Sequence, residues 1–361
     1  MKKIKINHLD LFSGIGGFHL GFEKAGFEVN SYFSEVDKYA IDVYKNNFKN
    51  SNYVGSVTDV RGTQLPKIDA ITFGSPCQDF SLAGKRKGMG GQRSSLITEA
   101  IRLIDECRPR FFIWENVKGT FSSNNGEDFW AIIQAFTNIG GYRLEWQLLN
   151  TKWFLPQNRE RIYLVGYLGN GSGGQVFPIR ETTRPNIKSS KKKHNKIVMP
   201  TICTNYWRFA NDTPVIKVKS ATSKGYEEAA EGDSINYSNP NSETRRGRVG
   251  KGVAQTLDTA CNQAVIYDGY NNKVKEENIV GTITQHCSRS GLTNGFKVIN
   301  ENKIRRLTPI ECERLQGFPD NWTQYGESGK ISDTQRYKMC GNAVTVDVVE
   351  AVANSIIKTI Y

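Results

Sequence analysis

Long apolar runs are missing from this sequence of 361 residues, in which 38% of the side chains are hydrophobic. No stretch approaches the roughly 18 apolar residues that a membrane-spanning helix requires. The first residues, Met1-Lys2-Lys3-Ile4-Lys5, also lack the apolar core of a secretory signal peptide. We therefore expect a cytoplasmic protein without a membrane segment, long enough for two domains.

Closely spaced cysteine pairs are missing as well. The seven cysteines are odd in number and include no Cys-x-x-Cys pair: Cys77, Cys107, Cys203, Cys261, Cys287, Cys312 and Cys340. This spacing argues against a disulfide framework and against a zinc site. We expect no metal, and we expect most of these thiols to be reduced and buried.

Acidic residues are in deficit. The formal net charge is +12, from 48 lysines and arginines against 36 aspartates and glutamates. Residues 181–303 hold 19 of the basic and 12 of the acidic residues, so much of the excess lies in about a third of the chain. Such a charge favours a polyanionic partner, although a well-solvated surface explains it equally well.

The first half of the sequence alternates strand and helix patterns. Apolar periodicity predicts strands at 4–12, 29–35, 69–73, 110–114 and 161–167, and helices at 17–25, 39–48, 98–107 and 129–139. This alternation is typical of an α/β protein with a doubly wound sheet.

The pattern changes after Tyr167, and helical periodicity is poor until about Leu307. Within this region, segments 199–204, 253–259 and 280–284 are rich in threonine and β-branched residues, which predicts short strands. Chance similarity among the three segments is an open alternative.

The chain accordingly divides into a domain at 1–180, a smaller, mostly β and irregular domain at 181–303, and a segment at 304–361. Helical patterns return at 308–315, with an N-cap threonine and a first-turn proline, and at 346–358. We expect this last segment to pack back on the α/β core.

A glycine-rich turn follows the first predicted strand: Phe12-Ser13-Gly14-Ile15-Gly16-Gly17. Such a turn lets the backbone approach a ligand and presents helix amides to negative groups. Glu35 lies 21 residues after Gly14, where a carboxylate can accept hydrogen bonds from both hydroxyls of a ribose. Together, the glycine-rich turn and Glu35 favour a site for a nucleoside cofactor, either a nicotinamide cofactor or S-adenosylmethionine. The alternative is that the turn is only structural and Glu35 is a surface residue.

A cysteine that directly follows a proline distinguishes between these two cofactors. Gly74-Ser75-Pro76-Cys77-Gln78 places Cys77 63 residues after Gly14. A thiolate is the side chain best suited to attack a weakly electrophilic ring carbon, whereas hydride transfer requires no thiolate. The sequence therefore predicts methyl transfer to a pyrimidine carbon.

Six segments in order resemble the motifs of DNA cytosine-5 methyltransferases, as found in modification enzymes of bacteria and phage: 10–18, 74–81, 114–117, 156–161, 306–319 and 341–344. The resemblance implies a Rossmann-like S-adenosylmethionine-dependent methyltransferase sheet and a smaller target-recognition domain. It implies methylation at C5 of a flipped-out cytosine in a specific double-stranded DNA sequence. A tRNA cytosine-5 methyltransferase is the alternative; a catalytically silent DNA-binding module and an NAD-dependent oxidoreductase are more remote.

The resemblance also implies roles for individual residues. Cys77, fixed by Pro76, bonds to cytosine C6; Glu115 binds cytosine N3 and the exocyclic amine; Arg161 reaches O2, and Arg159 supports the pocket and the Cys77 loop. The implied cofactor residues are Phe12, Gly14, Gly16, Gly17, Glu35, Val36, Ser56, Val57, Asp59, Gly74, Pro76, Asn342 and Val344. The implied DNA contacts, mostly on a basic, glycine-rich stretch that resembles the family's mobile loop, are Gln78, Ser81, Lys85, Arg86 and Arg93.

One segment departs from the family pattern. Where the family has Gly-Asp and an aliphatic residue, with the acid meeting the adenine amine, this chain has Gly55-Ser56-Val57. Either Ser56 or Asp59 takes that contact. The expected partners are duplex DNA and S-adenosylmethionine, with a cognate restriction endonuclease acting separately, and we expect a monomer.

Overall fold

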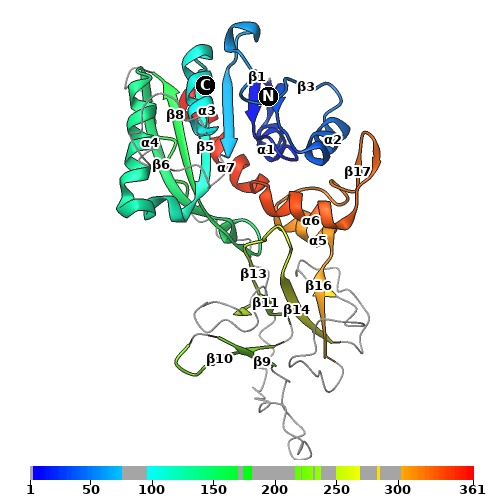
Figure 1. The fold of residues 1–361 in the computed structure, drawn as a ribbon. Helices are drawn as coiled ribbons and strands as arrows, with labels where there is room; N and C mark the ends of the chain where they lie inside the picture. Colours follow the sequence, from blue (N-terminus) through cyan, green and yellow to red (C-terminus); the bar gives the residue numbers. More distant parts are fainter. Residues whose placement is uncertain are drawn as a thin grey trace, which may run out of the picture.

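The structure, a computed structural model, describes residues 3–74, 96–169, 174–180, 216–220, 222–230, 232–236, 249–268, 283–284 and 302–361. Figure 1 shows an α/β part, which holds both ends of the chain, and a smaller part made of short strands. Helices α5 (Pro309–Leu315) and α6 (Asp333–Asn342) lie between the two parts.

Seven strands form the sheet of the α/β part, in the order β3-β2-β1-β4-β5-β8-β6. Their bounds are β1 Ile4–Leu11, β2 Phe27–Ser34, β3 Asn52–Tyr53, β4 Ala70–Gly74, β5 Phe111–Val117, β6 Tyr142–Asn150 and β8 Glu160–Leu168. The first five run parallel, and β8 runs antiparallel between β5 and β6. The strand order reverses between β1 and β4, and ligands of such sheets bind outside the carboxyl ends of the strands at this point.

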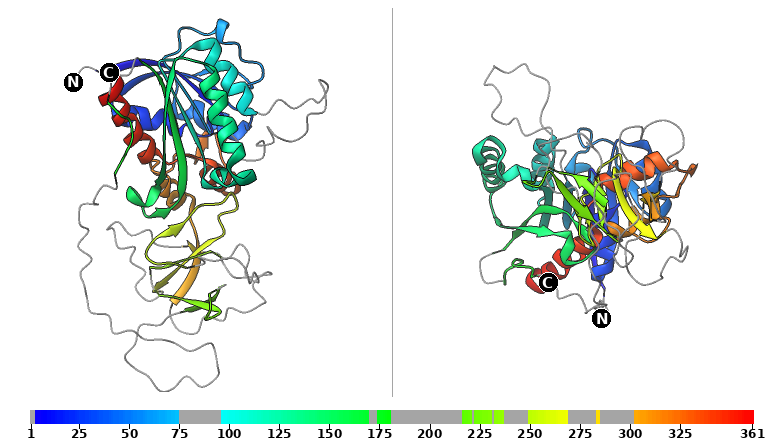
Figure 2. Two further views of the ribbon diagram at one scale, coloured as in Figure 1. Left: turned by 90° about the vertical axis from the view of Figure 1, so that its left-hand side faces the viewer. Right: turned by 90° about the horizontal axis from the view of Figure 1, so that it is seen from below.

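Helices cover both faces of the sheet, as the side view in Figure 2 shows. Helices α1 (Gly17–Ala25), α2 (Lys38–Asn47) and α7 (Val346–Ile360) pack on one face, and α3 (Leu96–Cys107) and α4 (Glu127–Asn138) pack on the other. Short 3-10 helices lie at Gly62–Gln64, Lys118–Phe121, Ser123–Gly126 and Thr151–Trp153.

The sequence of β5 shows why the sheet is covered twice. Phe112 and Trp114 pack with α3 and α4, whereas Phe111 and Ile113 pack with α1 and α7. Neighbouring side chains of a strand point to opposite faces, so a strand covered on both faces is apolar throughout.

The last helix, α7, lies directly against α1. Gly21 makes this close approach possible, because a Cβ atom there would lie 2.4 Å from Cγ1 of Val349. Val348, Val352 and Ile356 of the same helix are buried in the core. Helix α7 therefore packs on the α/β core.

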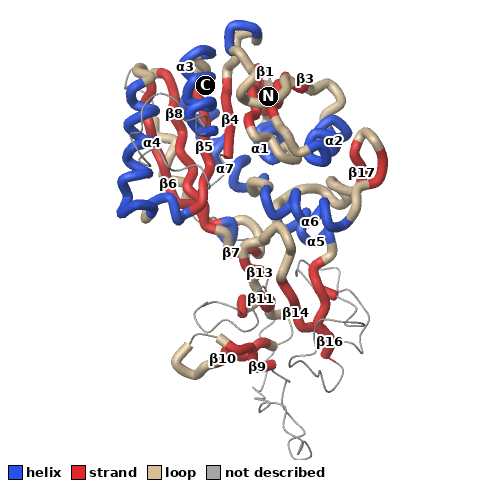
Figure 3. Tube along the Cα trace, viewed as in Figure 1, coloured by secondary structure: helices blue, strands red, loops and turns tan. Residues whose placement is uncertain are grey.

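The smaller part is a five-stranded sheet in the order β12-β11-β14-β16-β15, which we call the second sheet, with a separate hairpin of β9 and β10. Its strands are β9 Ile216–Lys219, β10 Tyr226–Ala229, β11 Ser234–Asn236, β12 Val249–Gly250, β14 Gln263–Asp268, β15 Ile283–Thr284 and β16 Asn302–Leu307. Figure 3 shows the contrast with the α/β part, since here the described residues are strands and loops.

Two further strand pairs tie distant parts of the chain together. β7 (Gln157–Asn158) pairs in parallel with β13 (Ala254–Gln255), and β17 (Tyr325–Gly326) pairs with β18 (Gly329–Lys330). The β7 and β13 pair joins the strand region before β8 to the segment that leads into the second sheet.

The doubly wound α/β prediction is confirmed, with most predicted ends within a few residues of those observed. β6 was not predicted, and the strand predicted at 4–12 ends at Leu11 because Phe12 has a positive φ of 52°. Strands exist within 253–259 and 280–284, whereas 199–204 lies outside the described residues. The three-part division remains a prediction, and β16 crosses its expected junction at 303–304.

Candidate active site

Most of the predicted site residues in the described part of the chain gather at the carboxyl edge of the large sheet. β1, β2, β4 and β5 are parallel, so they end at the same edge. The glycine-rich turn follows β1, Glu35 follows β2, Gly74 ends β4, and Glu115 lies near the end of β5.

The turn after β1 is strained at one residue and open at another. Phe12 has a φ of 52°, a left-handed conformation that costs energy for a residue with a side chain. Gly14 has a φ of 53°, and a Cβ atom there would meet nothing within 4 Å. The turn therefore borders open space at Gly14. Ser13, which the sequence did not single out, has a buried hydroxyl with no hydrogen bond among the described residues.

The other two glycines of the turn serve packing. A Cβ atom on Gly16 would lie 2.3 Å from the Phe48 ring, and one on Gly17 would lie 2.6 Å from Cγ2 of Val344. Gly17 thus allows the segment before α7 to approach α1. Val344, a predicted cofactor residue, is half-buried at this contact.

Glu35 is bonded to the glycine turn. Its Oε2 accepts a hydrogen bond from the Gly14 amide at 2.9 Å, and its Oε1 accepts from the amides of Val36 and Asp37 at 2.7 and 2.9 Å. The Val36 side chain is 76% exposed. The structure therefore brings Gly14, Glu35 and Val36 together, with an uncovered apolar side chain beside a fixed carboxylate.

The turn at 55–59 lies next to the end of β2. The Ser34 hydroxyl donates to the Gly55 carbonyl at 2.8 Å, which ties the turn to this strand. The Ser56 hydroxyl lies 3.0 Å from that of Thr58, and Asp59 is exposed. Val57 is buried in the core, so its side chain does not face the open edge.

Glu115 and Arg161 face each other across β5 and β8. Their side chains are largely buried, and Arg161 Nε lies 3.2 Å from Glu115 Oε1. Gly74 is the register partner of Glu115, and a Cβ atom on Gly74 would lie 3.2 Å from Glu115 Oε2. A glycine at this place therefore gives the carboxylate room. Asn116 orders the following turn by accepting from the Val117 amide at 2.7 Å.

Arg159 is directed to a different place. Its guanidinium donates to the Ala343 carbonyl at 2.9 Å and to the Gly341 carbonyl at 3.4 Å, at the C-terminal end of α6. A cation there satisfies terminal carbonyls and interacts favourably with the helix dipole. Asn342, the last residue of α6, is exposed beside this contact. Arg159 thus joins β8 to the segment that carries Asn342 and Val344.

The remaining predicted site residues lie outside the described residues: Pro76, Cys77, Gln78, Ser81, Lys85, Arg86 and Arg93. Only the connectivity of the chain relates them to the edge described above.

A buried polar group below the glycine turn was not predicted. The Thr72 hydroxyl donates to Asp10 at 2.8 Å and lies 2.7 Å from Nε2 of His8, and all three side chains are fully buried. Burial raises the pKa of Asp10 well above its usual range and lowers the pKa of His8 well below its own. The signal in the sequence was that His8 and Asp10 continue the face of β1 that begins with Ile4 and Ile6.

An open sheet with helices on both faces, a glycine turn after β1 and a bonded acid after β2 define an α/β enzyme of the Rossmann-like methyltransferase class. The family model for C-5 cytosine-specific DNA methylases matches residues 6–358. The chain belongs to this family. It transfers a methyl group to C5 of cytosine in DNA.

Relatives in the family cover almost the whole chain. It is 31% identical to the type II methyltransferase M1.ScrFI of Lactococcus lactis subsp. cremoris, over 99% of this chain and 80% of the relative. It is 32% identical to the type II methyltransferase M.FnuDI of Fusobacterium nucleatum, over 98% and 94%. A DNA modification methyltransferase encoded within an E. coli prophage shares the fold, with a TM-score of 0.59 at 20% identity over 98% of this chain and 99% of that one.

These findings do not favour the tRNA alternative, because the family model is that of C-5 cytosine-specific DNA methylases and both relatives are named as type II methyltransferases. Among the described residues, no helix combines the length and apolarity needed to cross a membrane.

Proposed function

We propose that the protein is a type II modification methyltransferase, which methylates one cytosine within a specific double-stranded DNA sequence through a covalent bond between Cys77 and C6. The observation that carries this proposal is the convergence of Glu115, Arg161 and Gly74 at one point of the sheet edge. Cys77 follows Gly74 by three residues, which span at most about 11 Å. The Cys77 thiol is therefore within reach of this site.

In the proposed reaction, the Cys77 thiolate attacks C6 and pushes electron density into the ring, which makes C5 nucleophilic. Glu115 bonds to N3 and the exocyclic amine. Arg161 bonds to O2, where negative charge develops, and its contact with Glu115 fixes both side chains before the base arrives. After methyl transfer, loss of the C5 proton allows the bond to Cys77 to break.

We propose that Arg159 acts by position rather than by contact with the base. Its bonds to the carbonyls of Gly341 and Ala343 support this role, because they hold the segment of Asn342 and Val344 against the strand of Arg161. The arginine would thereby keep the base pocket and the cofactor pocket in register.

The edge near Gly14 fits S-adenosylmethionine, which supplies a methyl group on a sulfonium centre. Gly14 borders open space, and Val36 offers an exposed apolar side chain to the adenine. A carboxylate has about four acceptor positions, and backbone amides already use three of those on Glu35. We therefore propose that Glu35 accepts from one ribose hydroxyl, rather than the two expected from the sequence.

Other cofactor contacts follow the predicted set. Ser56 and Asp59 both remain candidates for the adenine amine, and Phe12, Asn342 and Val344 would close the pocket. Gly16, Gly17 and Val57 would contribute through their packing, since neither the two glycines nor the valine side chain faces open space.

The target cytosine must leave the duplex, since stacked neighbours block attack on the face of its ring. We propose that Gln78, Ser81, Lys85, Arg86 and Arg93 contact the DNA around the vacated position, and that residues 181–303 read the sequence in the major groove. The positive charge of that region supports this role. We further propose a cytoplasmic monomer with a cognate endonuclease acting separately.

Covalent trapping tests the mechanism. With 5-fluorocytosine at the target position, fluorine cannot leave as a cation, so Cys77 should stay bonded to C6 in a denaturant-resistant complex. Cys77→Ser should abolish trapping and nearly all turnover, whereas Cys107→Ser, a control at the end of α3, should preserve both. If mass spectrometry places the adduct on another cysteine, or if an active enzyme forms none, the assignment of Cys77 is wrong.

An exchange of the region 181–303 between relatives tests whether this region recognises the DNA sequence. Replacing about residues 185–303 with the matching region of a relative should transfer the target site while the cytosine chemistry is kept. The downstream junction should fall just before Asn302 rather than at 303, so that β16 stays whole. Bisulfite sequencing of DNA from expressing cells would identify both sites, and an active chimera with the original site would contradict the assignment.

A further inference from the structure

The second sheet reaches the catalytic strand through a short segment of chain. β13 pairs with β7, and the Thr256 hydroxyl donates to the Asn158 carbonyl at 2.8 Å. Arg159 follows β7 directly, and Arg161 comes two residues later in β8. A shift of residues 254–256 would therefore move the backbone from which both arginines project.

A buried glutamine holds this segment to the second sheet. Gln263, the first residue of β14, is fully buried. Its Oε1 accepts from the Gln255 amide at 2.8 Å, and its Nε2 donates to the carbonyls of Gln255 and Thr256 at 2.8 and 2.9 Å. Both donors of the side-chain amide and one acceptor position are thus used on two consecutive residues.

The same segment is in contact with the end of α6. A Cβ atom on Gly341 would lie 2.7 Å from the carbonyl carbon and oxygen of Asp258. The Gly341 carbonyl also accepts from Arg159. Residues 254–258 are therefore held between β7 and α6, the two elements that determine the position of Arg159.

We propose that Gln263 is a positioning residue that makes the catalytic step depend on correct seating of the second sheet on DNA. Gln263 fixes residues 255 and 256 relative to β14, and these residues fix β7. When the second sheet is bound to the recognition sequence in DNA, β7 holds Arg161 opposite Glu115. On DNA with an altered sequence, the second sheet is displaced, and Gln263 and β13 transmit this displacement to β7 and thus to Arg159 and Arg161. The inference rests on the proposed function of the second sheet in reading DNA.

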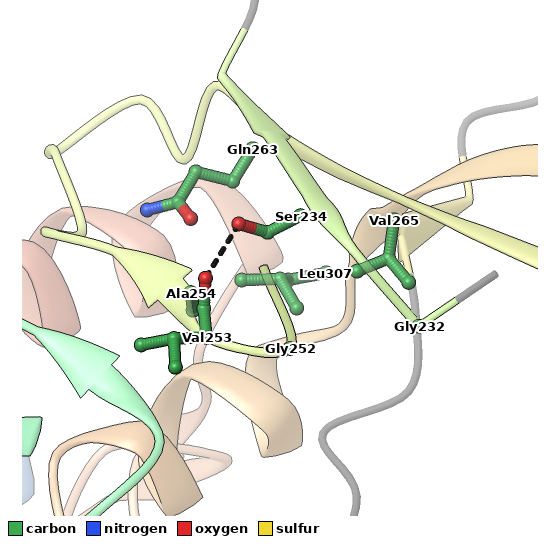
Figure 4. A pocket seen from close by; sticks show the side chains of 8 residues that line it. All are labelled: Gly232, Ser234, Gly252, Val253, Ala254, Gln263, Val265 and Leu307. Carbon is green, nitrogen blue, oxygen red and sulfur yellow. Dashed lines mark hydrogen bonds between the residues drawn. The ribbon is translucent and has the colours of Figure 1, made fainter. Parts of the chain in front are cut away.

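The pocket around Gln263 offers a matched control. In Figure 4, Ser234 lies beside Gln263, and its hydroxyl donates to the Val253 carbonyl at 2.8 Å. Gln263→Met removes all three bonds to residues 255 and 256 at similar side-chain volume. Ser234→Ala removes one bond in the same pocket and leaves those three intact.

The experiment uses the full chain and its recognition sequence, identified first by bisulfite sequencing. For wild type and variants, kcat and KM are measured on duplexes with that sequence and on duplexes with one base pair changed. Calorimetry gives the affinity for S-adenosylmethionine, and thermal unfolding reports stability.

We expect Gln263→Met to lower kcat on the recognition sequence about 10- to 100-fold, since small misplacements of catalytic groups cost this much. KM and cofactor affinity should change less than about threefold, because substrate and cofactor contacts remain. The ratio of kcat/KM between correct and altered sequences should narrow. Ser234→Ala should leave kcat within about threefold of wild type.

A wild-type kcat for Gln263→Met, or a rise in KM alone, would overturn the proposal. The proposal would also be overturned if both variants lost kcat to the same extent and in proportion to their loss of thermal stability. If Gln263→Met does not fold, Gln263→Glu decides, because it keeps the acceptor for the Gln255 amide and loses at least one of the two donations. An inactive wild type would instead refute the proposed function itself.

Discussion

The two parts of the molecule stabilise their cores differently. In the α/β part, β1 and β8 are eight and nine residues long, and helices cover both faces of the sheet. The strands of the second sheet have two to six residues, and its core includes Leu315 of α5 and Cys340 of α6. The second sheet therefore shares its core with helices that also adjoin the α/β part.

The large sheet thus fixes side chains through long, paired strands, whereas the second sheet depends on neighbouring helices for part of its core. The sheet edge holds Glu115 and Arg161 through strand register, which any shift of β5 or β8 would break. The second sheet depends on the core that it shares with α5 and α6 and on the pairing of β13 with β7.

The largest effect should follow a change at the sheet edge. Glu115→Gln keeps the size of the side chain but removes the charge beside Arg161, and we expect methyl transfer to slow about 10²- to 10⁴-fold. Single-turnover assays at a temperature where both proteins are folded would measure it. Glu160→Gln, which alters an exposed pair with Lys118, is the control. A Glu115→Gln rate close to that of the control would contradict the role.

The next largest effect is expected at α5 and α6, which lie between the two parts, and it concerns stability rather than rate. Glu313 is fully buried and bonds to Arg336 at 2.9 Å. Glu313→Gln leaves this arginine without its buried charge partner, which should lower the free energy of unfolding by about 3–5 kcal/mol. Urea unfolding measures the loss. Asp320→Asn, in the exposed pair with Arg314, should cost no more than about 1 kcal/mol, and equal costs would refute the distinction.

A smaller effect is expected for the cofactor. Glu35→Ala removes a charged acceptor from the ribose and should weaken S-adenosylmethionine binding by about 1.5–3 kcal/mol. Calorimetry measures the affinity, with Glu28→Ala as a control on the same stretch of chain, since Glu28 forms an exposed pair with Lys5. Unchanged affinity in Glu35→Ala would remove this residue from the site.

The smallest effect is expected in the α/β part, as a dependence of the free energy of unfolding on pH. Burial raises the pKa of Asp10, so the native state holds a proton that the unfolded chain releases above pH of about 4. This contribution to stability is largest below that pH and falls as pH rises toward the raised pKa. Asp10→Asn stays neutral, so its urea midpoint should fall less than that of wild type between pH of about 5 and 7. Parallel pH profiles would show that Asp10 ionises normally.

Local patterns in the sequence predicted most of the large sheet, because its strands and helices have clear apolar periodicity. β6 escaped prediction because it lies at the edge of the sheet, and only Leu149 and Asn150 of its residues are buried. The prediction for Thr308 as an N-cap is confirmed, since its hydroxyl accepts from the Glu311 amide at 3.3 Å.

The arrangement within the site could be predicted only in part. The contact of Arg161 with Glu115 depends on strand register, and that of Arg159 joins residues more than 180 positions apart. Neither follows from spacing along the chain. The motifs named the candidate residues, whereas the contact of Arg161 with Glu115 and the bonding of Arg159 to α6 and of Gln263 to β13 required the fold.

The position of α7 has a consequence for the growing chain on the ribosome. The face of the sheet that α7 covers is complete only once α7 has emerged, and α7 begins 335 residues after the end of β1. At about 5–20 residues per second, that interval lasts roughly 17–67 seconds. Phe18 and Phe22 of α1 lie next to this uncovered face. The nascent protein should therefore need chaperone protection late in translation, and premature termination before Val346 should yield chains that aggregate rather than shorter enzymes.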